Sequence, residues 1–329
     1  MNPPTAVAIE RLDHGTLSFL DFDHGISAID TGFERPLFDA SHLIIDHGRA
    51  AFVDAGVNAS VPMLIGVLEH KGLTPAAVDW LLLTHVHLDH AGGAGELLRR
   101  LPNAKLVVHP RGVRHMVDPT ALMAGASAVY GEDVVRRTYG TLTPVPPGRI
   151  VEATEGLELV LGSRRLTVFD TPGHARHHVC IRDGRSGHVF AGDMFGLSYR
   201  ELDVDGHQFV FPTTTPVQFE PQAMHASIDR LLALRPEAIY VTHYGQVREV
   251  ARLGADLHRL VDAHIEVALQ HRGAGVERHA SIKAGLADIL RDEARRQGWK
   301  MAPDALFRLM SSDLELNAQG LAVWLDSGA

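Results

Sequence analysis

The segment THVHLDHAGG, residues 84–93, places three histidines and an aspartate within six consecutive positions. Side chains two apart in an extended backbone project to the same side, so the imidazoles of His85 and His87 can reach one metal ion. Asp89 and His90 fall where the chain turns toward a helix, and they can face a second ion. This spacing predicts a compact centre for two metal ions.

Four candidate ligands share one context, because each follows an apolar run that is typical of a strand. His85 follows DWLLLT, His174 follows LTVFDTPG, Asp193 follows HVFAG and His243 follows AIYVT. Strands that end on the same side of a sheet form one rim, and binding sites collect there. We therefore expect these four side chains to converge.

The order of HVHLDH, TPGH, AGD and THYG resembles the metallo-β-lactamase-fold hydrolase superfamily, over about residues 40–245. The resemblance implies an α/β fold, the four-layer αββα sandwich, with metals at one edge of the paired sheets. Further stretches, among them HLDHAGGAG and TPGHARHH, resemble a subgroup of single-chain metallohydrolases with a helical C-terminal extension. Matched position by position, the resemblance implies one ion held by His85, His87 and His174, a second held by Asp89, His90 and His243, and a bridging carboxylate from Asp193.

Two ions held close together can share a water and lower its pKa, which gives a metal-bridging hydroxide near neutral pH. The second ion can stabilise the anion that develops on the substrate oxygen. Asp89 is the candidate catalytic residue, because its carboxylate can also orient this nucleophile. Imidazole and carboxylate ligands suit zinc, our first choice for the two divalent ions, and also iron and manganese.

Three more residues are candidates for supporting the metals or contacting the substrate. The resemblance implies that Asp54, in FVDAG, hydrogen-bonds a loop or a ligand histidine, and a turn-forming aspartate is the alternative. His178 follows His174 by four residues and either competes as a ligand or supports the site; the TPG turn favours His174. Tyr199 follows Asp193 by six residues, and lactone-cleaving relatives use a tyrosine near this region; a loop aromatic is the alternative.

The composition favours a small-molecule substrate. The chain has 329 residues, with 45% hydrophobic and 22% charged residues, which is typical of a globular protein. Its formal net charge of −9 argues against nucleic-acid partners. There are 21 histidines, and no single site needs so many, so most are expected at surface or supporting positions.

The same composition bears on the compartment. One cysteine, Cys180, allows no intrachain disulfide, as is usual in a reducing compartment. The first residues carry no apolar core behind a basic start, and no apolar run approaches the ~20 residues of a membrane span. We expect a cytoplasmic protein without membrane contact, and a homodimer stays open.

The chain is expected to divide into a catalytic domain, residues 1–250, and a helical C-terminal extension, residues 251–329. Gly92 and Gly93 lack side chains that would keep neighbouring backbone away from the site. FPTTTP is either a substrate-facing loop or a rigid connection. Hydrophobic periodicity predicts hairpins at residues 42–56, 157–174 and 178–193, and helices at residues 61–72, 95–101 and 224–234.

The first functional hypothesis is a binuclear metal-dependent hydrolase acting on a small ester-like substrate, with thioesters, lactones and related acyl compounds first. The C-terminal helices show no basic clamp of the kind a glutathione thioesterase needs. The alternative is a mono-iron oxidoreductase similar to sulfur dioxygenases, although His90 and His243 together favour two ions. The third hypothesis is a non-catalytic regulatory protein that retains the metal site.

Overall fold

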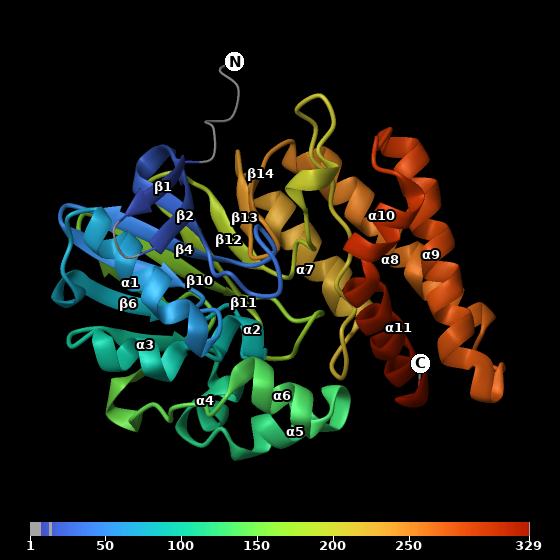
Figure 1. The fold of residues 1–329 in the computed structure, drawn as a ribbon, viewed down its shortest axis with the longest axis horizontal. Coiled ribbons are helices and arrows are strands. Elements are labelled where there is room, and N and C mark those ends of the chain that lie inside the picture. Colours follow the sequence, from blue (N-terminus) through green and yellow to red (C-terminus); the bar gives the residue numbers. More distant parts are fainter. Residues whose placement is uncertain (1–7, 13–14, 329) are drawn as a thin grey trace. The chain divides into compact units, whose positions relative to one another are not determined.

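The computed structural model describes residues 8–12 and 15–328. The first seven residues, from which the sequence predicts no leader, lie outside the described residues. The chain forms an α/β sandwich of two mixed sheets with C-terminal helices, as the sequence predicts (Figure 1). The first sheet comprises β1 (Ala8–Leu12), β2 (Gly15–Phe22), β3 (Ile26–Asp30), β4 (Ala40–Asp46), β5 (Arg49–Val53), β6 (Val78–Leu82), β7 (Lys105–Val108) and β8 (Ile150–Glu152). These strands follow one another in sequence order, antiparallel from β1 to β5 and parallel from β5 to β8.

The second sheet comprises β9 (Glu158–Leu161), β10 (Arg164–Asp170), β11 (Val179–Asp183), β12 (Val189–Gly192), β13 (Ile239–Val241) and β14 (Gly245–Val247). Its order is β14-β13-β12-β11-β10-β9. The pairs β9–β10, β10–β11 and β11–β12 are antiparallel. The three predicted hairpins are confirmed as β4–β5, β9–β10 and β11–β12.

β5 shows why a sandwich forms, because both of its faces are apolar. Ala51 and Val53 belong to the core that also contains Val168 of β10, between the two sheets. Ala50 and Phe52 alternate with them and belong to the core on the opposite face of the first sheet. Each fully buried aliphatic or aromatic side chain contributes about 1.5–3 kcal/mol to stability. Because both faces of β5 are apolar, the strand needs a core on each side.

The opposite core is closed by helices that lie before and after β6. Leu64 and Val67 of the first helix and Leu97 of the third are fully buried in it. The predicted helices at residues 61–72 and 95–101 are thereby confirmed. The helices of this part of the chain are α1 (Val61–His70), α2 (Leu88–Ala91), α3 (Ala94–Arg100), α4 (Pro110–Val117), α5 (Thr120–Tyr130) and α6 (Glu132–Tyr139).

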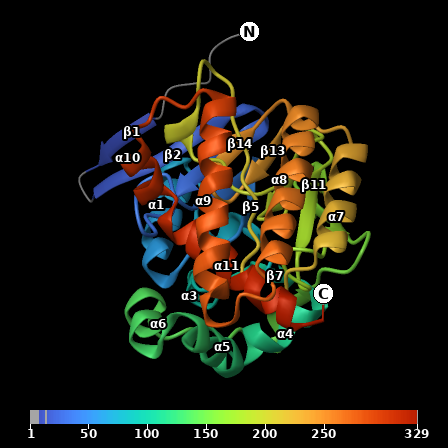
Figure 2. The same ribbon diagram turned by 90° about the vertical axis from the view of Figure 1, so that its right-hand side faces the viewer.

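The later part of the chain is helical, as predicted (Figure 2). Its helices are α7 (Pro221–Ala233), α8 (Val250–Gln270), α9 (Arg278–Gln297), α10 (Pro303–Leu309) and α11 (Ser311–Asp326). α7 confirms the helix predicted at residues 224–234. Among the described residues, no helix combines the length and the apolar character that crossing a membrane would require.

Contacts between residues divide the chain into two units, each discontinuous in sequence. Unit 1 contains the chain up to Asp170 with His177–Gly192 and Tyr240–Gln246. Unit 2 contains Thr171–Arg176, Asp193–Ile239 and the chain from Val247. The domain boundary after residue 250 stays a prediction.

Candidate metal centre

Two histidines of unit 1 converge on one carboxylate oxygen, Oδ2 of Asp89. Asp89 and His90 lie on α2, and His243 follows the last residue of β13 by two positions. The Nε2 atoms of His90 and His243 lie 3.7 and 3.4 Å from this oxygen. The ligand atoms of the three residues all lie within 4.8 Å of one another, so the group could hold a metal ion.

In both histidines of this group, the other ring nitrogen, Nδ1, is hydrogen-bonded to an oxygen. His90 Nδ1 lies 2.8 Å from Oδ2 of Asp54, and His243 Nδ1 lies 2.9 Å from the carbonyl oxygen of Phe38. An acceptor oxygen at Nδ1 places the ring proton there and leaves the lone pair on Nε2. Nε2 would therefore be the atom through which both rings bind a metal, and this arrangement fits a divalent cation.

Asp54 connects three segments of unit 1. Its carboxylate accepts a hydrogen bond of 2.8 Å from the Thr84 backbone nitrogen and further bonds from the hydroxyls of Thr84 and Thr242, at 2.8 and 3.1 Å. Asp54 has a φ of 60°, a left-handed conformation that aspartate adopts more readily than most residues. The buried carboxylate thus holds the residue before His85, the residue before His243 and the ring of His90.

The glycine after α2 permits the close backbone approach that the sequence predicts. A Cβ atom on Gly93 would lie 2.7 Å from the carbonyl oxygens of both Ala55 and Val57. The Gly93 nitrogen also donates a hydrogen bond of 2.8 Å to the carbonyl of Gly56. Any larger residue here would push α2 away from the segment that carries Asp54.

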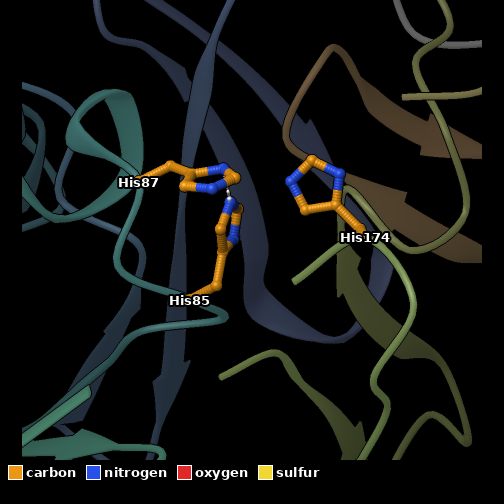
Figure 3. Close-up of side chains that lie close together, drawn as sticks. All are labelled: His85, His87 and His174. Atoms are coloured by element: carbon orange, nitrogen blue, oxygen red, sulfur yellow. Dashed lines mark hydrogen bonds between the residues drawn. The ribbon is translucent and has the colours of Figure 1, made fainter. Parts of the chain in front are cut away.

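His85 and His87 lie between β6 and α2, and Figure 3 draws them together with His174. His85 Nε2 and His87 Nδ1 are 2.8 Å apart, which is the dashed contact in the figure. His85 is fully buried, and its Nδ1 lies 3.1 Å from the hydroxyl of Thr84. The His178 ring stacks on His85 with a centroid distance of 5.1 Å. His178 therefore packs beside a candidate ligand.

Unit 2 brings together the other two predicted ligands. His174 Nε2 lies 3.5 Å from Oδ2 of Asp193. His174 Nδ1 lies 3.0 Å from the carbonyl oxygen of Thr213, and the Thr213 hydroxyl donates a hydrogen bond of 3.0 Å to the Asp193 carbonyl. One residue of the FPTTTP loop thus contacts both candidate ligands and, as for the unit 1 histidines, leaves the Nε2 lone pair of His174 for a metal.

The FPTTTP loop is itself fixed by α11. Asn317 accepts a hydrogen bond of 2.7 Å from the Thr214 nitrogen and donates one of 2.8 Å to the Pro212 carbonyl. Asn317 is buried, so both bonds are shielded from water. A Cβ atom on Gly320, one turn further along α11, would lie 1.6 Å from the Thr214 carbonyl oxygen. The C-terminal helix therefore positions Thr213, which sequence reasoning missed.

Tyr199 contacts α11 as well. Its side chain is fully buried, and its hydroxyl donates a hydrogen bond of 3.0 Å to Oδ1 of Asp313. A substrate contact for Tyr199 stays a prediction. His177 is buried, and its Nδ1 lies 3.4 Å from the Val86 nitrogen. A single unpatterned histidine gives no sign of such a long-range contact.

Burial and the charge of Asp89 raise the pKa of neighbouring side chains in unit 1. Burial raises the pKa of Asp39 to about 7, and the nearby His243 ring opposes this rise. Burial and then the Asp89 charge raise the pKa of Glu34, and the same two causes raise the pKa of Tyr139. A divalent cation would relieve the repulsion between these carboxylates, so the electrostatics fit a metal centre.

An aromatic wall lies beside His243. The Phe38 ring is 5.1 Å from the His243 ring, and Phe33 lies 5.9 Å from both Phe38 and Tyr139. All three aromatic side chains are buried. The wall offers an apolar surface next to a candidate ligand. It was not identified from the sequence because Tyr139 lies far along the chain from Phe33 and Phe38.

Comparisons with known proteins agree with this fold. The metallo-beta-lactamase fold-containing protein ST1585 of Sulfurisphaera tokodaii is 27% identical over 228 residues, 68% of this chain and 79% of the relative. A hydroxyacylglutathione hydrolase of Xanthomonas euvesicatoria pv. vesicatoria is 29% identical over 306 residues, 88% of this chain and 96% of the relative. The crystal structure of the metallo-beta-lactamase family protein TTHA1429 from Thermus thermophilus has a TM-score of 0.64 at 21% identity, covering 92% of this chain and 93% of that chain.

The sandwich and its histidine–aspartate groups define a class of metal-dependent hydrolases. The sequence profile of the metallo-beta-lactamase superfamily matches residues 35–243, more than half of the chain. The chain belongs to the metallo-beta-lactamase superfamily, and its fold and hydrolase relatives place it among the metallohydrolases.

Proposed function

We propose that the protein is a binuclear metallohydrolase that cleaves a small ester-like substrate, with thioesters first and lactones next. The observation that carries the proposal is the convergence of His90 Nε2 and His243 Nε2 on Asp89 Oδ2. We propose that the protein holds two divalent ions, zinc before manganese or iron, and that His85, His87, Asp89, His90 and His243 of unit 1 are among the ligands. His174 and Asp193 stay the further ligands that the sequence predicts.

The substrate class rests on two further points. The Xanthomonas relative is named for the hydrolysis of an acylated glutathione, and a sulfur-linked acyl group is a thioester. The wall formed by Phe33, Phe38 and Tyr139 is apolar, which suits the acyl portion of such a substrate. The net charge of −9 supports a small molecule rather than a nucleic acid.

The roles of the side chains follow from their bonds. When bound, the ions supply Lewis acidity that activates water and stabilises negative charge on the substrate oxygen. His90 and His243 bind through Nε2, in the tautomer that Asp54 and the Phe38 carbonyl impose. The carboxylate of Asp89 orients the attacking water toward the carbonyl carbon.

Metal content tests this proposal first. Protein purified without chelators is analysed by elemental mass spectrometry. His85→Ala and His243→Ala are the two ligand substitutions, and His271→Ala is a control outside the ligand set. We expect about two zinc or manganese ions per chain in the unaltered protein and in the control, because two metals form the hydrolytic centre. Both ligand substitutions should lower the number of metal ions per chain.

Thioester, lactone and phosphodiester substrates are then assayed with the same proteins. Thioester or lactone hydrolysis that is lost in His85→Ala and His243→Ala supports the proposal. One iron per chain, lost in His85→Ala but kept in His243→Ala and accompanied by oxygen consumption, contradicts it. Full metal occupancy without turnover of any of these substrates contradicts it as well.

A further inference from the structure

A second histidine cluster lies on two helices of unit 2, outside the residues of the candidate metal centre. α7 and α8 lie side by side (Figure 2). His225 and Asp229 lie one turn apart on α7, and His258 and Asp262 lie one turn apart on α8. His225 Nε2 lies 3.0 Å from Oδ1 of Asp262, and His258 Nε2 lies 3.1 Å from Oδ1 of Asp229. The four residues thus form two crossed pairs.

The remaining ring nitrogens of this cluster face each other. The Nδ1 atoms of His225 and His258 are 2.6 Å apart, and the rings are 5° from parallel. A carboxylate accepts a hydrogen bond only from a protonated nitrogen, so both Nε2 atoms carry protons, and in the neutral rings both Nδ1 atoms present lone pairs. Two lone pairs at this distance repel each other unless a positive group lies between them.

We propose that His225 and His258 bind a divalent transition-metal ion, such as zinc, through their Nδ1 atoms. Zinc–nitrogen bonds of ~2.0–2.1 Å in a tetrahedral site place two such nitrogens about 3.3 Å apart. The two Nδ1 atoms, now 2.6 Å apart on the line between the ring centres, need to separate by less than ~1 Å, and both rings need to turn so that their lone pairs point at the ion.

Two observations favour a metal over a shared proton. Asp229 and Asp262 already form the carboxylate–imidazole bonds that orient histidine ligands in zinc sites. The histidine pair His85–His87, which the proposed function assigns to a metal, shows the same approach of two ring nitrogens, at 2.8 Å.

The cluster is open to ions from solvent. The His225 and His258 side chains are 26% and 25% exposed, and those of Asp262 and Asp229 are 65% and 73% exposed. Water can therefore fill the coordination positions that the two imidazoles leave. Since the ligands come from different helices, a bound ion links α7 to α8, and the folded state becomes more stable as the ion concentration rises.

Calorimetric titration tests the site. Zinc is added to full-length protein whose metal centre has been loaded and whose excess metal has been removed. We expect one further zinc per chain, absent in His225→Ala and in His258→Ala. Asp229→Asn should weaken this binding by about 10–100-fold, because the carboxylate orients its ligand ring. His271→Ala, at the end of α8, is the matched control and should bind as the unaltered protein does.

Thermal unfolding supplies a second readout. Added zinc should raise the Tm of the unaltered protein and of His271→Ala, but not that of His225→Ala or His258→Ala. Equal further binding in all variants, or none in the unaltered protein, would overturn the proposal. The four residues lie outside the metal centre, so the substrate assays of the proposed function can fail without changing this result.

Discussion

At the scale of single residues, the site depends on the groups behind the candidate ligands. Asp54 is not one of the predicted metal ligands. Its carboxylate nevertheless fixes the His90 ring and the backbone at Thr84. A carboxylate behind an imidazole holds the ring in one tautomer and raises its affinity for a metal. The geometry of the centre is therefore encoded partly by a residue that touches no ion.

Asp54→Asn tests this support. Asparagine tolerates the φ of 60° at this position, so the backbone should be preserved. The amide nitrogen, however, would oppose the His90 Nδ1 proton with a second donor. We expect metal affinity to fall about 10–100-fold, measured by competition with a chelator of known affinity.

The matched control for Asp54→Asn is Asp23→Asn, an exposed aspartate in the turn between β2 and β3. The control should keep the affinity of the unaltered protein. Equal affinities in the two variants would show that the Asp54 carboxylate does not support the metal ligands.

At the scale of elements, the C-terminal extension fixes the surroundings of the two candidate ligands in unit 2, His174 and Asp193. Asn317 of α11 holds both sides of the FPTTTP loop, and Thr213 of that loop contacts His174 and Asp193. Gly320 allows the helix backbone to approach the loop at a distance that no side chain permits. α11 is therefore part of the framework of the site.

Asn317→Ala tests the framework. The change leaves the Thr214 nitrogen and the Pro212 carbonyl buried without these hydrogen bonds, at a cost of about 1–3 kcal/mol each. We expect a lower free energy of unfolding in denaturant and fewer metal ions per chain. Gln319→Ala, which removes a bond to Glu315 on the same helix, should change neither quantity appreciably. Unchanged metal content in Asn317→Ala would separate α11 from the site.

The strands and hairpins could be predicted from the sequence because their determinants are local. The turn at Gly162 and Ser163 and the alternation of β9 and β10 are visible in one short stretch. Four candidate ligands, His85, His174, Asp193 and His243, could be predicted for the same reason, since each follows a strand. Asn317 could not, because 103 residues separate it from Thr214 and no pattern in α11 marks the contact.

The helical histidine cluster shows the same limit. His225 and Asp229 have ordinary spacing for a helix surface, as do His258 and Asp262. Only the packing of α7 against α8 brings the two imidazoles together. The excess of histidine in the sequence predicted supporting positions in general, but it did not show which histidines would pair.

At the scale of the whole molecule, two further histidines link stability to pH. His42 of β4 and His264 of α8 are buried in apolar surroundings, His264 against Phe211. Burial lowers the pKa of His42 to about 3 and that of His264 to about 4. In the unfolded chain both should return to a pKa near 6.5, so the unfolded state binds more protons below that pH.

The free energy of unfolding should therefore fall as the pH drops from about 6.5 toward 4, by up to ~1.4 kcal/mol per pH unit for each histidine. His264→Gln removes one of these protons and keeps a donor for the Leu260 carbonyl, so its slope should be smaller by about one proton. Urea titrations across this window measure the slope. The partly exposed His271, changed to Gln, should leave the slope unaltered. An identical slope in His264→Gln would mean that this ring is not held neutral by the fold.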